Sequence, residues 1–232
     1  MPLRPRPAAL RTEAKRAPQV WDLPVRLFHW LLVALIAGAW WTADHGQMQI
    51  HRPIGYAIAG LLAFRLWWGV AGSSTARFSG FVKGPRAVVR YAVALARGGD
   101  APGPPGHNPM GGWSVVGLLS LLTAEVGLGL FSVDVDGVES GPLADRVSFE
   151  AGRLAAHWHH WLFNGLLALI ALHLLAIAAY ALRRDNLLGP MLTGRKASAA
   201  APGLRPAAPW RLWAGIILGL LAAVALAKGL KL

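Results

Sequence analysis

The sequence predicts an all-α integral membrane protein, built as a four-helix transmembrane bundle with an additional C-terminal transmembrane helix. Of its 232 residues 55% are hydrophobic, and the mean hydropathy of +0.43 is too high for an ordinary soluble domain of this length. Several apolar stretches also approach the roughly 20 residues that a helix needs to cross the hydrocarbon core of a bilayer. The five predicted crossings are residues 27–43, 53–70, 113–132, 157–182 and 212–228.

The first two crossings are short for spanning segments and contain polar residues. They are kept because the first contains His29, the second follows directly after His51, and Trp40 and Trp41 suit an aromatic belt at the membrane interface. The third and fourth crossings are longer and more apolar. The fifth places Lys228 and Lys231 outside the cell, against the usual preference for internal lysine, so its assignment rests on hydropathy alone.

The net charge of +12 is distributed by loop instead of gathering on one soluble face, which argues against nucleic-acid binding. Residues 1–26 carry six Lys/Arg against two acids, residues 71–112 carry five against one, and residues 183–211 carry six against one. Residues 133–156 reverse the balance, with two Arg against five acids. Because cationic loops stay in the cytoplasm, we expect a multi-pass protein of the bacterial inner membrane with a cytoplasmic N-terminus.

We expect one membrane domain with polar extensions. Residues 1–20 are interpreted as a cytoplasmic tail, which we expect to be retained because no small-residue cleavage site follows the first apolar run. Residues 21–196 form the membrane domain, 197–211 a linker and 212–232 the extra helix. Shorter features are a basic amphipathic helix at 85–97, a turn-rich connector at 98–112 and an outward amphipathic segment at 142–156.

The chain has no cysteine, which excludes disulfides, iron–sulfur clusters and covalent haem attachment through Cys-x-x-Cys-His. A metal cofactor would therefore be held by His, Met or carboxylate. Histidine is costly in hydrocarbon and tends to be functional there, although any single one could be an interfacial residue beside tryptophan. Six of the eight histidines lie within or at the ends of apolar helices: His29, His51, His157, His159, His160 and His173.

The spacing of two histidines in the fourth crossing predicts haem ligation. His159 and His173 are 14 residues apart, so at about 100° per residue they share a helix face, and they are separated axially by roughly 21 Å. The two histidines on that face could each ligate one haem, with one haem in each leaflet. His160 lies about 140° around the helix from His173. It is a poorer partner, but a 13-residue spacing remains an alternative.

Each haem needs a second axial ligand at the same membrane depth. His29 starts the first crossing on the cytoplasmic side, which pairs it with His173. His51 starts the second crossing on the outer side, level with His159. An iron with two axial imidazoles favours outer-sphere electron transfer over oxygen binding. The prediction is one-electron transfer across the membrane through two b-type haems.

Several segments together resemble the bacterial cytochrome b561 family, which is related to the b-type cytochrome subunit of nickel-iron hydrogenases. They are VWDLPVRLFHW (20–30), IHRPIGY and FRLWWGVAGSSTARF (within 50–78), GHNPMGGW (106–113), HHWLFNGLLALIALH (159–173) and LLGPMLTGRK (187–196). The resemblance implies a four-helix di-haem bundle that exchanges electrons with quinone and redox partners. It points to the same four ligands, the histidines at 29, 51, 159 and 173. His160 departs from the pattern, since many relatives carry glutamate there.

Further residues have two interpretations each. Arg65 could pair with a haem propionate near the cytoplasmic haem or be a snorkelling interfacial arginine. Glu125, the only acid inside a crossing, could conduct protons or pair with Arg65. His45 and His107 are interpreted first as turn or surface residues, then as quinone or propionate contacts. Six glycines could admit a flat macrocycle or simply pack helices: Gly38, Gly55, Gly60, Gly117, Gly127 and Gly129.

Three functional hypotheses follow. The first is a di-haem carrier between the quinone pool and a redox partner protein, such as a cytochrome or a subunit of the dehydrogenase or hydrogenase type. The second, which the resemblance permits, is a stand-alone superoxide:quinone oxidoreductase, so whether the protein is an enzyme is left open. The third is a histidine-lined metal transporter. All three place the protein among membrane lipid and none involves nucleic acid.

Overall fold

The computed structural model describes residues 17–97, 106–196 and 204–231. Within these residues the chain is helical and forms no β-strand, only two isolated bridges between Gln19 and Arg195 and between Val133 and Ser140. The helices are α1 (Leu23–Asp44), α2 (Met48–Ala71), α3 (Phe78–Phe81), α4 (Pro85–Ala96), α5 (Pro109–Phe131), η1 (Ala144–Arg146), α6 (Phe149–Leu182), α7 (Leu188–Thr193) and α8 (Pro209–Ala227).

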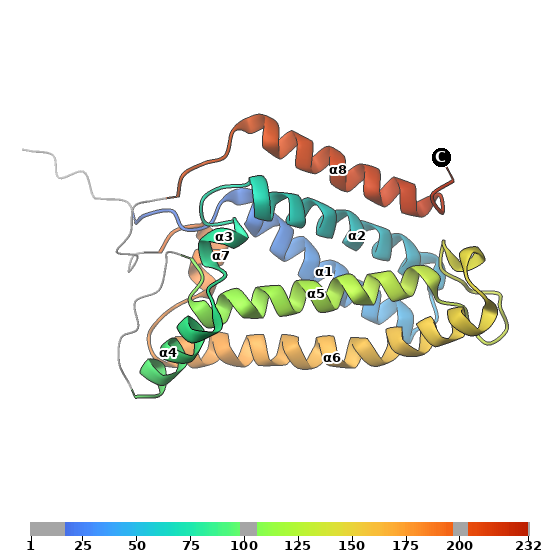
Figure 1. The fold of residues 1–232 in the computed structure, drawn as a ribbon, viewed down its shortest axis with the longest axis horizontal. Coiled ribbons are helices and arrows are strands. Elements are labelled where there is room, and N and C mark those ends of the chain that lie inside the picture. The colour runs from blue at the N-terminus through green and yellow to red at the C-terminus, as the bar shows by residue number, and fades with distance from the viewer. Residues whose placement is uncertain (1–16, 98–105, 197–203, 232) are drawn as a thin grey trace, which may run out of the picture.

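Four long helices lie side by side as a bundle, and α8 covers it along α2 (Figure 1). Helix α1 packs on α2, α2 on α5, and α5 along α6. Five helices are long and apolar enough to cross a membrane, which are α1, α2, α5, α6 and α8. The prediction of an all-α membrane bundle with a fifth, C-terminal helix is therefore confirmed.

Four of the segments quoted for the resemblance, at residues 20–30, 64–78, 106–113 and 187–196, meet at one end of the bundle. We call it the basic end; it comprises residues 17–26, 72–97, 106–109 and 183–208. Asp22 caps α1 by accepting from the Val25 amide at 2.8 Å, and its other oxygen accepts from the Trp68 indole at 2.9 Å. The Gly194 carbonyl, after α7, accepts from the amides of Val20 and Trp21. These bonds join the start of α1 to the ends of α2 and α7.

The opposite end carries an acidic loop that contains Asp134, Asp136, Glu139 and Asp145. We call it the acidic end; it comprises residues 45–47, 132–148 and 228–231. Arg52 of α2 pairs with Glu139 at 3.1 Å and donates to the Ser140 carbonyl, which ties this loop to the bundle. His45 is exposed and bonds within its own turn to the Trp41 carbonyl at 2.8 Å. Its interpretation as a turn residue is supported by this contact.

All five long helices begin before their predicted crossings, by three to eight residues. Helix α2 begins at Met48, so Pro53 lies inside it and not at its start. Helix α6 begins at Phe149, because the Ser148 side chain caps it by accepting from the Ala151 amide, and it absorbs much of the predicted amphipathic segment 142–156. Helix α5 begins at Pro109, capped by Asn108, so 109–112 is helix and not connector. The predicted tail (1–20) and linker (197–211) lie partly outside the described residues.

Helix α4 is held against the membrane domain by a small polar cluster. It matches the predicted amphipathic helix at 85–97 and buries only Tyr91. The Tyr91 and Tyr180 hydroxyls lie 2.9 Å apart, and the Asn108 amide donates to Tyr180 at 2.8 Å. Burial of the Tyr91 hydroxyl and its bond to Tyr180 raise the pKa of Tyr91 above its usual range. The hydroxyl therefore stays protonated and able to donate.

Candidate functional site

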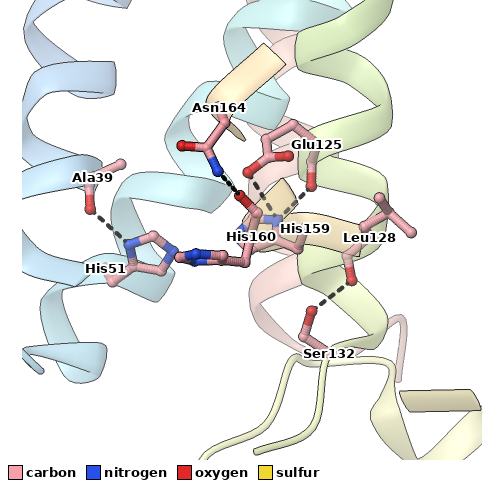
Figure 2. A network of polar contacts seen from close by, with 8 residues as sticks. All are labelled: Ala39, His51, Glu125, Leu128, Ser132, His159, His160 and Asn164. Atoms are coloured by element: carbon pink, nitrogen blue, oxygen red, sulfur yellow. Dashed lines mark hydrogen bonds and ion pairs between the residues drawn. The ribbon is translucent and has the colours of Figure 1, made fainter. Parts of the chain in front are cut away.

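Two of the four predicted ligand histidines face each other near the acidic end. His51 lies in the first turn and a half of α2 and His159 lies in α6, and their ring centroids are 6.2 Å apart with an interplanar angle of 84°. In Figure 2, His51 points from its helix toward the α6 histidines, with Glu125 of α5 on the far side of His159. The structure therefore brings together the pair that depth alone predicted.

Hydrogen bonds fix the tautomer of both rings. The Nδ1 of His51 lies 2.9 Å from the Ala39 carbonyl, and the Nδ1 of His159 lies 2.9 Å from the Glu125 carbonyl (Figure 2). A backbone carbonyl can only accept, so each Nδ1 carries the proton and donates it. Each Nε2 is then left with a free lone pair, which is the form of imidazole that binds a metal.

The separation of these rings fits an iron held between them. Two metal–nitrogen bonds of about 2 Å each, extended to the ring centres, require centroids roughly 6 Å apart. The measured 6.2 Å meets that requirement. Helix α6 packs mainly along α5 and makes no comparable contact with α1 or α2 in the described part of the chain. The ligand-bearing helices are thus spaced more widely than those that touch directly.

The neighbouring histidines are placed differently. His157 and His160 are both exposed, whereas His159 is partly buried. The His160 carbonyl accepts from Asn164 in the normal course of the helix, and its ring makes no aromatic contact with His51 of the kind made by His159. These facts favour the 14-residue spacing over the 13-residue alternative.

The other two histidines lie toward the basic end. His29 in α1 and His173 in α6 are both partly buried. The Nδ1 of His29 is buried and has no hydrogen-bond partner. Four more buried polar atoms without a partner among the described residues belong to the same end: the Nε of Arg26, the hydroxyls of Ser73 and Thr75, and the Nδ1 of His107. Such atoms are costly unless a bound group satisfies them.

Arg65 is buried at this end, with 3% of its surface exposed. Its guanidinium lies 4.8 Å above the Phe78 ring and 6.0 Å from the Phe28 ring, and it donates to the Ala76 carbonyl at 3.4 Å. The interpretation of Arg65 as a snorkelling surface residue is therefore wrong. Its pairing with Glu125 is also wrong, because Glu125 contacts His159 instead. A buried guanidinium suits a carboxylate such as a haem propionate.

His107 is not the surface residue that its loop position suggested. Its ring lies 4.5 Å from that of Trp21 and 4.4 Å from that of Phe81. Burial, helped by the nearby charges of Arg65 and His173, lowers the pKa of His107 to about 3. The ring is therefore neutral at physiological pH, and it joins the polar cluster around Arg65.

The six glycines divide between the two interpretations. Gly60 touches α8, since an added Cβ would lie 2.7 Å from the Gly219 carbonyl, and Gly38 faces Ile54. These two serve helix packing. Gly129 lies against His159, with an added Cβ 3.0 Å from its Cε1. Added side-chain atoms at Gly55 and Gly127 would meet nothing within 4 Å, and at Gly117 only Leu169 at 3.9 Å, so these three positions are open.

A comparison with known protein families identifies the family of this chain. Residues 20–194 match the family described as prokaryotic cytochrome b561. The chain belongs to this family. The match covers α1 to α7, including all four histidines, and ends before α8. No curated protein and no solved structure matches the chain.

Membership of the cytochrome b561 family makes this a multi-pass membrane protein that transfers electrons through haem b. Among the described residues, no group of three or more His, Cys, Asp or Glu side chains could hold a free metal ion. A haem iron needs fewer ligands from the protein, because the macrocycle supplies four and only two axial imidazoles are required. The sequence analysis did not predict the contact between Glu125 and His159. The position of this single acid inside an apolar crossing did indicate that it has a specific partner.

Proposed function

We propose that the protein carries electrons across the bacterial inner membrane through two bis-histidine b haems, between the quinone pool and a redox partner protein. His51 and His159 hold the outer haem, and His29 and His173 hold the inner one. Haem iron with two axial imidazoles supplies reversible one-electron chemistry. The observation that carries the proposal is the 6.2 Å separation of the His51 and His159 rings with both Nδ1 atoms donating to the backbone.

The inner site is supported by the cluster at the basic end. His29 and His173 both lie toward this end, and Arg65 supplies a buried positive charge. The unpartnered atoms of His107, Ser73 and Thr75 offer further polar contacts. We assign the propionates of the inner haem to this cluster, because a carboxylate would compensate the Arg65 charge and satisfy buried donors.

The spacing of the ligands on α6 supports a relay. His159 and His173 lie in one unbroken helix, so the two sites are separated along it by roughly 21 Å. One site then lies toward each membrane face. The excess of Lys/Arg in the loops of the basic end supports placing that end, and the inner haem, in the cytoplasm.

Single replacements of the four ligands test the pairing. Replacing His29 or His173 with alanine should remove the same low-spin b-haem component, or convert it to high spin, because one iron needs both imidazoles. Replacing His51 or His159 should remove the other component. Reduced-minus-oxidised spectra of the purified protein, with pyridine haemochrome quantification, give the components and the number of haems per chain.

His160→Ala is the matched control, since His160 is exposed and adjacent to the proposed ligand. It should leave two low-spin haems per chain. The proposal fails if the wild-type protein holds one haem per polypeptide. The pairing fails if His160→Ala removes the outer component while His159→Ala keeps it, or if His29→Ala and His51→Ala damage one common haem.

A further inference from the structure

We propose that Glu125 is a positioning residue for the outer haem: its carboxyl oxygen accepts the Nδ1–H of His159 and lowers the reduction potential of that haem. This inference rests on the proposed function, because it assumes that His159 ligates iron. It assigns a role to the only acid inside a crossing, a residue that does not itself touch the cofactor.

The geometry places two oxygens of Glu125 on one nitrogen. The Nδ1 of His159 lies 2.9 Å from the Glu125 carbonyl and 3.2 Å from its Oε1 (Figure 2). The Glu125 side chain is buried, with 6% of the residue exposed. Its second oxygen, Oε2, is also buried and has no partner. No competing cation or donor therefore draws the carboxyl away from the histidine.

A second acceptor on Nδ1 has a defined effect on the opposite nitrogen. Drawing the Nδ1 proton toward a carboxyl oxygen increases electron density at Nε2 and makes the imidazole a stronger base toward metal. A stronger donor ligand stabilises Fe(III) over Fe(II), so the reduction potential falls.

Neither His51 nor His29 shares this arrangement. His51 donates to a backbone carbonyl alone, and the Nδ1 of His29 has no acceptor. The inner site instead has the buried positive charge of Arg65, which favours the reduced, more negative state of a nearby haem. The Glu125 carboxyl therefore separates the two potentials, with the outer haem the lower of the two.

The test is redox potentiometry of the purified, haem-loaded protein with Glu125→Leu and Glu125→Gln. The Leu variant removes the side-chain acceptor but keeps the backbone carbonyl, so the ring stays oriented and the haem should be retained. We expect the midpoint of one component, the one lost in His51→Ala, to rise in Glu125→Leu and to rise less in Glu125→Gln. The component lost in His29→Ala should not move.

Thr123→Val is the matched control. Thr123 is an exposed polar residue on the same helix and bonds only to the Leu119 carbonyl. It should leave both midpoints unchanged. As a second readout, the low-spin ferric EPR signal of the outer haem should change its g values in Glu125→Leu, because these report ligand strength, and should be closer to wild type in Glu125→Gln.

The outcomes separate this inference from the proposed function. If the wild type contains two low-spin haems and neither midpoint moves in Glu125→Leu, the role of Glu125 is wrong while the di-haem assignment stands. A fall in the midpoint overturns it equally. If Glu125→Leu loses the outer haem, the test rests on Glu125→Gln. An unshifted midpoint potential of the outer haem in Glu125→Gln then overturns the inference. If the wild type binds no low-spin haem, the proposed function itself fails.

Discussion

At the level of single residues, backbone groups of one helix orient the ligand of the next. The Ala39 carbonyl of α1 holds His51 of α2, and the Glu125 carbonyl of α5 holds His159 of α6. Gly129, one turn after Glu125, completes the support by leaving room for the His159 ring. The position of this ring is therefore determined by α5 as much as by α6.

Gly129→Ala should weaken the outer haem site. The added Cβ would lie 3.0 Å from the His159 Cε1, so the ring must shift by a few tenths of an ångström. Changes in groups that orient a ligand commonly cost about 10-fold or more in metal affinity. We expect the outer haem to transfer at least about 10-fold faster to apomyoglobin, with the inner haem unaffected.

Gly127→Ala is the control for this prediction. It makes the same chemical change two residues earlier on α5, where an added Cβ meets nothing within 4 Å. Both haems should transfer at the wild-type rate. Two outcomes would contradict the prediction: equally faster transfer of both haems in Gly129→Ala, or faster transfer of the same size in Gly127→Ala. Either would show that the substitution disturbs α5 as a whole and not the His159 ring.

The four histidines proposed as ligands could be selected from the sequence because their positions follow helical periodicity and membrane depth. The partners of those ligands could not. Whether Glu125 faces His159 or Arg65 depends on the rotation of α5 against α6, which the nearly uniform apolar sequence of α5 does not specify. His107 was misjudged for a related reason: Trp21 and Phe81, which cover it, are distant in sequence.

At the level of elements, α8 is the addition to the family core. It lies along α2 through a seam of small residues, in which an added Cβ at Gly219 would meet the Gly60 carbonyl at 2.7 Å and one at Gly215 the Trp67 ring at 2.7 Å. The Trp67 indole donates to the Arg211 carbonyl at 2.8 Å. Close backbone approach of this kind drives helix association in lipid, where no hydrophobic force acts between helices.

Gly219→Val should loosen α8 without removing haem. A β-branched side chain in this contact overpacks the seam, at a cost of about 1–3 kcal/mol. Because all four ligands lie in residues 20–194, the haem spectrum should be unchanged. Limited proteolysis between residues 197 and 211 should become faster, and the temperature of thermal unfolding in detergent should fall.

Leu220→Val provides the comparison, since Leu220 lies on the same helix with 62% of its surface exposed. It should unfold at the wild-type temperature. Loss of either haem in Gly219→Val would contradict the separation of α8 from the haem-binding core, and it would assign to α8 a part in shaping the adjacent helix α2.

The existence and order of the helices could be predicted, because length and hydropathy determine which segments cross a bilayer. Their ends could not, since caps decide them locally. Ser148 starts α6 eight residues before the predicted crossing, and Asn108 starts α5 four residues before its own. The contact between α8 and α2 was also not predicted. A glycine in an apolar segment does not by itself indicate which helix it packs against, and this holds for both Gly60 and Gly219.

At the level of the whole molecule, charge separates the two ends of the bundle. The loops at residues 71–112 and 183–211 together carry 11 Lys/Arg, whereas residues 133–156 carry five acids. Lys231 of the C-terminal segment pairs with Asp145 at 3.0 Å, which lowers the pKa of Asp145. The Arg146 guanidinium donates to the Gly229 carbonyl at 3.1 Å. These contacts place the end of α8 against the acidic loop (Figure 1).

The pairing of Lys231 with Asp145 accounts for one of the two lysines that the charge rule disfavours on the outer side. A cation outside the cytoplasm is disfavoured mainly during insertion, and here an acidic loop receives it on the same side. The basic loops should therefore still control the orientation of the bundle, with the basic end in the cytoplasm. The C-terminus should lie in the periplasm, because α8 crosses the membrane once more.

Two reporter fusions test this topology together. A reporter fused after Ala197 precedes α8 and should behave as cytoplasmic, whereas one fused after Leu232 follows α8 and should behave as periplasmic. Alkaline phosphatase, active only in the periplasm, and green fluorescent protein, fluorescent mainly in the cytoplasm, should give opposite signals at each site. Periplasmic activity at Ala197 would reverse the bundle and exchange the sides assigned to the two haems. Cytoplasmic signals at both sites would leave the haem assignments intact and show that α8 does not cross.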